Sequence, residues 1–257
     1  MRSGDGRLGG QVAVVTGGGR GIGRAIVEKL AAEGARVAAW DVQPAASEDF
    51  DAPPDRVLCL RCDVSVEAEV AAAGKATGQS LGPVSVLVNN AGVNAYFDAT
   101  RMTEADWERF MGVDLKGPWL CCKHLLPGMR EAKGGVVVNI ASIHAFMTAP
   151  GMFPYAAAKS GVLGLTRSLA LDHGKEGIRA VAVCPGWIHT HLVDEWLERQ
   201  PDAEAALGAV VARHPRGRIG TPADVANLVA FLASSEADFI TGTAHLIDGG
   251  LSAQFSN

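Results

Sequence analysis

Tyr155, Lys159 and Ser142 are the residues of this 257-residue chain whose types and spacing are best suited to chemistry. Tyr155 and Lys159 stand four residues apart, so on a helix they share one face. An unperturbed tyrosine is a poor base because its pKa is ~10, but a lysine ammonium beside the phenol favours the ionised form. Ser142, thirteen residues upstream, could hold a substrate oxygen. The trio predicts proton transfer coupled to hydride chemistry, although such a Tyr/Lys pair alone is more often an ordinary helix-surface contact.

A glycine-rich turn near the start of the chain predicts a nucleotide site. Residues 16–23, Thr-Gly-Gly-Gly-Arg-Gly-Ile-Gly, join a predicted buried strand to an amphipathic helix. Glycines at this junction let backbone N–H groups approach a pyrophosphate at the helix N-terminus, where the helix dipole favours anions. The glycines at 17, 21 and 23 give G-x-x-x-G-x-G, so the strict G-x-G-x-x-G spacing is absent.

Asp41 ends the second predicted strand, eighteen residues after Gly23. A carboxylate at this place binds the adenosine ribose hydroxyls of NAD and repels the 2'-phosphate of NADP. Two alternatives remain: Asp41 is a solvated strand-end residue, or Arg20 in the glycine turn binds a 2'-phosphate. The sequence therefore favours NAD and leaves NADP open.

Short β-rich runs alternate with longer helical patterns along the chain, which predicts a parallel sheet wrapped by helices. The predicted strands are 12–16, 36–40, 56–62, 84–89, 136–140, 179–184 and 244–247, and most are continuously apolar, as in strands buried on both faces. The predicted helices are 21–33, 66–79, 103–129 with a break, 155–174 and 222–233. Right-handed crossovers favour an α/β fold with one domain: a Rossmann-like, doubly wound parallel sheet in a three-layer α/β/α sandwich.

Composition narrows the class of protein. With 48% hydrophobic residues, positions 11–257 can form one dinucleotide-binding catalytic domain after a Gly-rich, flexible leader at 1–10. No apolar run approaches the ~20 residues that span a bilayer, so a soluble, cytoplasmic protein without a membrane partner is expected. The net charge of -5 gives no footprint for nucleic acid. The five cysteines favour reduced thiols, and the C-x-x-C pair of Cys59 and Cys62 lacks a second ligand pair, so no metal is expected.

Together these motifs resemble those of the short-chain dehydrogenase/reductase family, in the branch that carries Y-x-x-x-K. The resemblance covers nearly all of residues 11–250. Further segments that carry it are Asp63-Val64, Asn89-Asn90-Ala91-Gly92, Pro185-Gly186-Trp187-Ile188-His189-Thr190, Arg218-Ile219-Gly220-Thr221-Pro222, Ile240-Thr241-Gly242 and Asp248-Gly249-Gly250.

The resemblance implies a mechanism and a cofactor site. A hydride leaves a substrate carbinol carbon for the nicotinamide while Tyr155 removes the hydroxyl proton, Ser142 donates to the developing oxyanion, and Lys159 assists the tyrosine and binds the nicotinamide ribose. Asp63 is implied to contact the adenine amino group. The cofactor-binding residues implied are Gly17, Arg20, Gly21, Ile22, Gly23, Asp41, Asp63, Val64, Asn90, Ala91, Gly92, Tyr155, Lys159, Pro185, Gly186, Ile188 and Thr190.

Asp114 departs from the family pattern. It stands in Val-Asp-Leu-Lys-Gly, where the family has the asparagine of V-N-L-x-G, which helps hold a water that relays protons from the lysine. An ionised carboxylate only accepts hydrogen bonds, and its charge raises the pKa of Lys159. Asp114 is therefore expected to preserve the relay as a fourth catalytic residue, and its replacement by asparagine to alter the pH profile more than the maximal rate.

The resemblance places the substrate pocket after the serine, after N-A-G and after P-G. The residues at these places are Asn94, Tyr96, His144, Phe146, Met152, Trp187, His189, His191 and Trp196. The tryptophans favour a partly apolar wall, whereas Asn94, His144 and His191 could bind hydroxyls or a carboxylate. The segment 189–216 is expected to form one or two helices over the substrate, as a mobile lid or a fixed cap.

The expected function is NAD-dependent interconversion of a secondary alcohol and its ketone, the alcohol being a sugar, polyol, hydroxy acid or small cyclic alcohol. One alternative is an NADPH-dependent carbonyl reductase of the 3-oxoacyl type. The other is a catalytically impaired nucleotide-binding regulator, for which Asp114 is the only support. An enoyl reductase is disfavoured because that branch spaces its tyrosine and lysine more widely. The resemblance also implies a homotetramer, with the helices at 103–129 and 155–174 between subunits.

Overall fold

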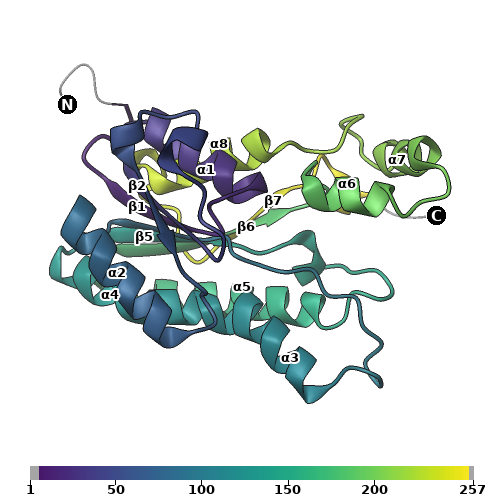
Figure 1. Cartoon of the computed structure of the whole chain (residues 1–257), viewed down its shortest axis with the longest axis horizontal. Helices are drawn as coiled ribbons and strands as arrows, with labels where there is room; N and C mark the ends of the chain where they lie inside the picture. The colour runs from purple at the N-terminus through teal and green to yellow at the C-terminus, as the bar shows by residue number, and fades with distance from the viewer. Residues whose placement is uncertain (1–5, 255–257) are drawn as a thin grey trace.

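A seven-stranded parallel sheet between two helix layers forms the centre of the computed structural model, which describes residues 6–254 (Figure 1). Its strands are β1 (Val12–Thr16), β2 (Arg36–Asp41), β3 (Val57–Arg61), β4 (Val86–Asn89), β5 (Gly135–Ile140), β6 (Ile178–Pro185) and β7 (Ala244–Ile247). Their order is β3-β2-β1-β4-β5-β6-β7, with every neighbouring pair parallel. The predicted doubly wound sheet is confirmed. The order reverses between β1 and β4, and ligands of such sheets bind at the carboxyl edge of this switch point.

Alternating side chains of β1 pack against opposite helix layers. Ala13 and Val15 share a core with α1 (Gly21–Ala32) and α8 (Pro222–Ala233). Val12 and Val14 face a second core with α2 (Glu67–Leu81), α4 (Gly117–Glu131) and α5 (Tyr155–His173). The two layers lie on either side of the sheet in Figure 1. Burial on both faces explains why this strand is continuously apolar.

The predicted break in the helix at 103–129 is a π-helical turn. Residues Gly112–Lys116 join α3 (Glu104–Met111) to α4 in this conformation. Gly117 follows the turn, and a Cβ there would lie 2.8 Å from Val64 Cγ2, so the backbone passes close to the neighbouring loop. The turn carries Asp114 into the interior, where it is 1% exposed. Single π turns of this kind are frequent at functional sites.

The segment 189–216 forms two short helices at one end of the molecule, α6 (His191–Leu197) and α7 (Ala203–Ala212) (Figure 1). Val193, Val210 and Ile219 form a small apolar core of their own, against which Trp187 and Trp196 pack. This core is separate from the two cores that flank the sheet.

The flexible leader predicted at 1–10 is wrong for residues 6–10, which pack on the end of α1. Leu8 is fully buried, and its N–H donates to the Glu33 carbonyl over 2.9 Å. Arg7 Nε lies 2.8 Å from Glu33 Oε2 in an ion pair. Residues 1–5 lie outside the described part of the chain.

Two strands are shorter than predicted. The strand expected at 56–62 is Val57–Arg61, because Pro54–Arg56 forms a 3-10 turn, and the strand expected at 84–89 is Val86–Asn89. Among residues 6–254, no helix has both the length and the apolar character needed to cross a membrane.

Candidate active site

Three of the predicted catalytic residues lie at the end of β5 and in the first turns of α5. Ser142 follows β5 by two residues and is 6% exposed, whereas Tyr155 opens α5 and is half-buried. Lys159, one turn further along α5, is 4% exposed, and its Nζ lies 5.5 Å from the centre of the Tyr155 ring. The helical spacing therefore does place the cation beside the phenol.

Two oxygen atoms hold the Lys159 ammonium in place. Nζ donates to the Ile140 carbonyl over 3.4 Å and lies 3.4 Å from Asp114 Oδ1. The same Oδ1 accepts from the Val93 N–H at 3.1 Å, while Asp114 Oδ2 is buried without a protein partner in residues 6–254. A Cβ on Gly92 would lie 2.7 Å from Asp114 Oδ1, so only glycine fits beside this pair.

The buried pair has shifted pKa values. Burial raises the pKa of Asp114, and the attraction of Lys159 opposes this only in part. Burial lowers the pKa of Lys159, but the combined attraction of Asp114 and Tyr155 outweighs it, and the net shift is upward. The lysine is therefore an ammonium ion at neutral pH.

His144 connects the serine to the tyrosine. Its backbone N–H donates to Ser142 Oγ over 3.2 Å, and its ring meets the Tyr155 ring edge to face, with centroids 5.7 Å apart. Its Nδ1 lies 3.0 Å from Thr148 Oγ1, which leaves Nε2 directed elsewhere. Burial lowers the pKa of His144, so the imidazole is neutral at pH 7.

The glycine turn has the shape of an anion site. Gly17 and Gly21 adopt positive φ angles of 62° and 56°. A Cβ on Gly23 would lie 1.9 Å from the Gly17 carbonyl oxygen, which no side chain tolerates. Asn90 Nδ2 donates to the carbonyls of Thr16 and Gly17, at 3.0 and 3.1 Å, and fixes the turn against the loop after β4. These residues fit the pyrophosphate of a dinucleotide, because α1 begins here with no side-chain cap and no acidic residue in its first turn.

The two predicted adenosine carboxylates lie after β2 and β3. Asp41 Oδ2 accepts from the Gly19 N–H and Oδ1 from the Gln43 N–H, both at 3.0 Å, so the carboxylate is fixed beside the glycine turn. Asp63 Oδ1 accepts from the Ser65 N–H and hydroxyl, at 2.9 and 2.7 Å, and Oδ2 makes no hydrogen bond within residues 6–254. Val64 is buried, and Arg20 is exposed at the start of α1.

The segment after β6 approaches the glycine turn from the other side. Gly186 passes close to Asp248, since a Cβ there would lie 2.8 Å from the Asp248 Cβ. Ile188 is buried and forms a parallel bridge with Gly220. Thr190 is the N-cap of α6, yet its hydroxyl makes no capping hydrogen bond and remains available for a ligand.

Some of the predicted substrate-pocket residues are brought together and others are not. Trp187 and Trp196 contact each other, with ring centroids 5.1 Å apart, and pack against the small apolar core of Val193, Val210 and Ile219. The loops that carry Asn94 and Met152 lie side by side, because the Phe97 N–H donates to the Phe153 carbonyl over 3.0 Å. Phe146 is exposed. His191 is different: its Nδ1 lies near the glycine turn, 3.9 Å from a Cβ placed on Gly21.

Sequence reasoning missed two contributors to the site. The Thr16 hydroxyl accepts from the N–H groups of Asn90 and Ala91, both at 3.0 Å, and its position directly before the glycines was the only available signal. The Ile140 carbonyl, which accepts from Lys159, has no sequence signal because every residue carries a carbonyl.

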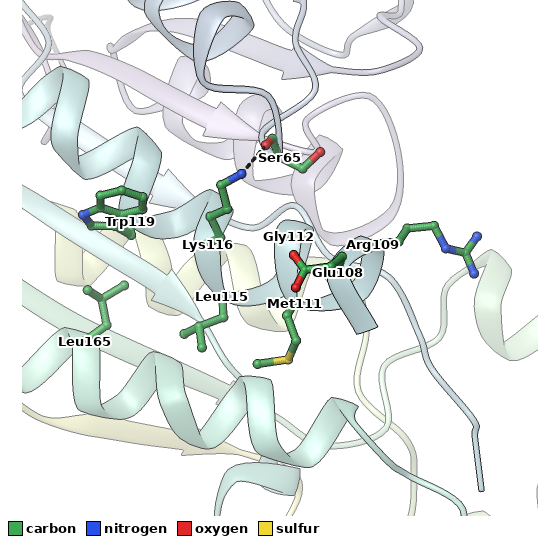
Figure 2. A pocket seen from close by; sticks show the side chains of 9 residues that line it. All are labelled: Ser65, Glu108, Arg109, Met111, Gly112, Leu115, Lys116, Trp119 and Leu165. Carbon is green, nitrogen blue, oxygen red and sulfur yellow. Dashed lines mark hydrogen bonds between the residues drawn. The ribbon is translucent and has the colours of Figure 1, made fainter. Parts of the chain in front are cut away.

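A separate cavity lies over α3, the π turn and α4, away from Tyr155. Figure 2 shows its lining, in which Lys116 Nζ donates to the Ser65 carbonyl over 3.2 Å. The lining residues are Ser65, Glu108, Arg109, Met111, Gly112, Leu115, Lys116, Trp119 and Leu165. No cluster of three metal-ligating side chains occurs among the described residues.

The fold and this site define an oxidoreductase that handles a nucleotide cofactor, and the comparisons with known proteins agree. A family model described as Enoyl-(Acyl carrier protein) reductase matches residues 17–252. The chain belongs to the short-chain dehydrogenase/reductase family. Dehydrogenases of this family use nicotinamide dinucleotides and act on CH–OH donors.

Three similar proteins span nearly the whole chain. The 2-(R)-hydroxypropyl-CoM dehydrogenase of Xanthobacter autotrophicus is 40% identical over 251 residues, which cover 95% of this chain and 99% of that protein. An uncharacterized oxidoreductase of Thermotoga maritima is 39% identical over 256 residues, covering 96% and 98%. The ligand-free structure of Thermoplasma acidophilum aldohexose dehydrogenase has a TM-score of 0.90 at 36% identity, covering 99% of this chain and 98% of that one.

Proposed function

We propose that this protein is an NAD-dependent dehydrogenase that interconverts a secondary alcohol and its ketone, with Tyr155 as the general base and acid. The observation that carries the proposal is the buried Lys159 ammonium, held beside the Tyr155 ring by Asp114 and the Ile140 carbonyl. A cation fixed at this distance stabilises negative charge on the phenol oxygen.

Each side chain then has a distinct role. Tyr155 Oη takes the substrate hydroxyl proton during oxidation and returns it during reduction. The Ser142 hydroxyl, whose oxygen already accepts from the His144 N–H, donates its own proton to the substrate oxygen. When bound, the nicotinamide accepts or supplies the hydride.

Asp41 supports NAD as the cofactor. Its carboxylate is fixed by two backbone N–H groups beside the glycine turn, where a ribose hydroxyl donates to it and a 2'-phosphate meets its negative charge. Arg20 is the only feature of the turn that favours NADP, and its side chain is exposed. A fixed carboxylate outweighs a solvated guanidinium, because screening by water weakens the exposed charge.

The surroundings of Tyr155 support a substrate with a second polar group, as in a sugar, polyol or hydroxy acid. His144 is neutral, touches the Tyr155 ring and has Nε2 left over from its contact with Thr148. This nitrogen can bond a substrate oxygen near the reacting carbon. The names of two relatives, a hydroxypropyl-CoM dehydrogenase and an aldohexose dehydrogenase, are consistent with a hydroxyl-bearing substrate.

The test is a substrate screen with the Tyr155→Phe variant as its control. NADH or NADPH absorbance is followed with NAD and with NADP over a panel of sugars, polyols, hydroxy acids and cyclic alcohols. We expect turnover with NAD, a loss of at least about 10³-fold in kcat for Tyr155→Phe, and a Kd for NADH within about twofold of the wild type.

Other outcomes separate the alternatives. Faster turnover with NADP, most of all on 3-oxoacyl compounds in the reducing direction, identifies a carbonyl reductase. Tight NADH binding without turnover on any compound identifies a nucleotide-binding regulator. Full activity of Tyr155→Phe contradicts the assignment of the general base.

A further inference from the structure

His191, whose sequence position made it a candidate for the substrate pocket, lies beside the cofactor turn. A Cβ placed on Gly21 would lie 3.6 Å from Thr190 Cγ2 and 3.9 Å from His191 Nδ1. Gly21 is the first residue of α1, and His191 is the first residue of α6. The imidazole therefore lies across from the backbone that opens the nucleotide-binding helix.

The start of α1, beside His191, is suited to an anion. α1 spans twelve residues and has no side-chain cap and no acidic residue in its first turn, so its N-terminal N–H groups and its dipole are not neutralised by protein. Thr190 likewise makes no side-chain capping bond. A side chain on Gly21 would meet Thr190 and His191 at ordinary contact distance, so the glycine keeps its backbone open beside both residues.

The backbone that carries His191 is anchored on both sides. The His189 N–H donates to the Gly220 carbonyl over 2.8 Å, and His189 Nε2 lies 2.9 Å from Asp194 Oδ1. The Val193 N–H donates to the Thr190 carbonyl at 2.8 Å. These contacts tie the start of α6 to the loop at Gly220, so the backbone that carries the imidazole is held beside the glycine turn.

We propose that His191 is a further ligand of the cofactor pyrophosphate. Its imidazole N–H donates to an oxygen of the phosphate that the N–H groups of Gly21 and Ile22 bind. The inference rests on the proposed function, because it requires a dinucleotide in the glycine turn. A hydrogen bond to an ionised phosphate is charge-assisted, and losing one such bond costs about tenfold in affinity.

Binding measurements on the whole enzyme test this without turnover. The Kd values of NADH, ADP and adenosine are measured by calorimetry or competition for wild type, His191→Ala and His191→Gln. We expect His191→Ala to weaken NADH and ADP by the same factor, about tenfold, and to leave adenosine unchanged because it lacks phosphate. His191→Gln retains an N–H donor and recovers part of the affinity. His173→Ala, at the far end of α5, serves as the control for loss of a histidine.

Three results overturn the inference in distinguishable ways. NADH affinity that is unchanged in His191→Ala, with normal binding by the wild type, removes His191 from the pyrophosphate site and leaves the proposed function intact. A raised KM for the substrate with unchanged cofactor affinity indicates that His191 contacts the substrate rather than the pyrophosphate. Failure of the wild type to bind NADH or NADPH contradicts the proposed function itself.

Discussion

Asp114 and Lys159 control each other's charge at the centre of the site. Both side chains are buried, 3.4 Å apart, and the pKa of each is raised. For the lysine, the cost of burial is outweighed by the attraction of Asp114 and Tyr155. An asparagine in place of Asp114 would hold its position but not its charge, so the carboxylate extends the pH range over which the lysine is an ammonium ion.

Replacing Asp114 with asparagine should therefore move the alkaline limb of the pH-rate profile. Without the negative neighbour, Lys159 loses its proton at lower pH, so we expect the limb to move to lower pH, with a maximal rate within about threefold. The measurement is kcat between about pH 6 and 10, and Glu176→Gln, a surface carboxylate paired with Arg130, is the control. A superimposable profile would mean that Asp114 serves only packing.

At the residue scale, the sequence predicted which side chains belong to the site better than it predicted the groups that they contact. Tyr155, Lys159 and Asp114 lie together as expected, because helical spacing and the order of motifs determine which edge of the sheet each reaches. The contact of His144 with Tyr155 depends on how the loop after β5 folds back, and this is a tertiary property. His191 shows the same limit, since its place in the chain does not say which side of α6 meets the glycine turn.

At the scale of elements, the junction of β1 and α1 depends on close backbone contact. Gly23 lies in α1, where an added Cβ would lie 1.9 Å from the Gly17 carbonyl oxygen and 2.5 Å from Asn90 Nδ2. Both atoms belong to the framework of the nucleotide site. The glycine is needed for the approach of helix and turn rather than for an unusual φ.

Gly23→Ala should weaken NADH binding by more than tenfold and lower the free energy of unfolding by about 2 kcal/mol, because the turn must move to admit the methyl group. Gly78→Ala in α2 is the matched control: no atom lies within 4 Å of its Cβ, and alanine in a helix should add about 0.5–1 kcal/mol of stability. Calorimetry and urea unfolding give the two quantities. An NADH affinity in Gly23→Ala equal to that of the wild type would contradict the close contact between α1 and the glycine turn.

The ion pair between Arg7 and Glu33 predicts that the stability of the fold depends on pH. Hydrogen bonding from Arg7 and pairing with Lys29 lower the pKa of Glu33 from its usual 4.5 to about 2. A depressed carboxyl pKa stabilises the fold above pH 4.5, and this contribution is lost as the pH falls through about 2. Glu33→Gln should cost about 2 kcal/mol at pH 7 and progressively less below pH 4.5.

Urea unfolding of wild type and Glu33→Gln at several pH values measures this difference. Glu236→Gln, whose contact with Arg7 is longer at 3.4 Å and more exposed, should change stability by less than about 0.5 kcal/mol. A Glu33 effect that does not vary with pH would show that packing, rather than charge, anchors the segment.

Strands and helices were predictable where one sequence pattern, such as a continuous apolar run, identifies the element. Continuous apolar runs identified the central strands, since strands buried on both faces leave no polar position, whereas β7 at the edge of the sheet is partly exposed. The π turn at Gly112–Lys116 was predicted only as a break, because a wider helical turn has no composition of its own. The anchoring of residues 6–10 involves buried Leu8 and the Arg7–Glu33 ion pair, and the glycines and polar residues that flank Leu8 predict neither contact.

At the scale of the whole molecule, the fold leaves large apolar side chains exposed on elements that lie apart in the sheet order, Trp119 on α4 and Leu246 on β7. Trp119 is 47% exposed and lines the cavity over α3 and α4 together with Met111 and Leu165 (Figure 2). On another element, β7 ends the sheet and carries Leu246, which is also about half exposed. A tetramer with two-fold axes needs at least two different contact faces, so these surfaces support the homotetramer that we propose.

Trp119→Arg should split this assembly at one face only. A cation at the centre of an apolar interface is desolvated without a partner, whereas contacts through the β7 face are untouched, so we expect dimers rather than monomers. Light scattering after size exclusion measures the mass, and Leu192→Arg, an exposed apolar residue on α6, should leave it unchanged. A wild-type protein with the mass of a monomer would contradict the proposed tetramer. A Trp119→Arg variant with the wild-type mass would place the subunit contacts on faces other than α4.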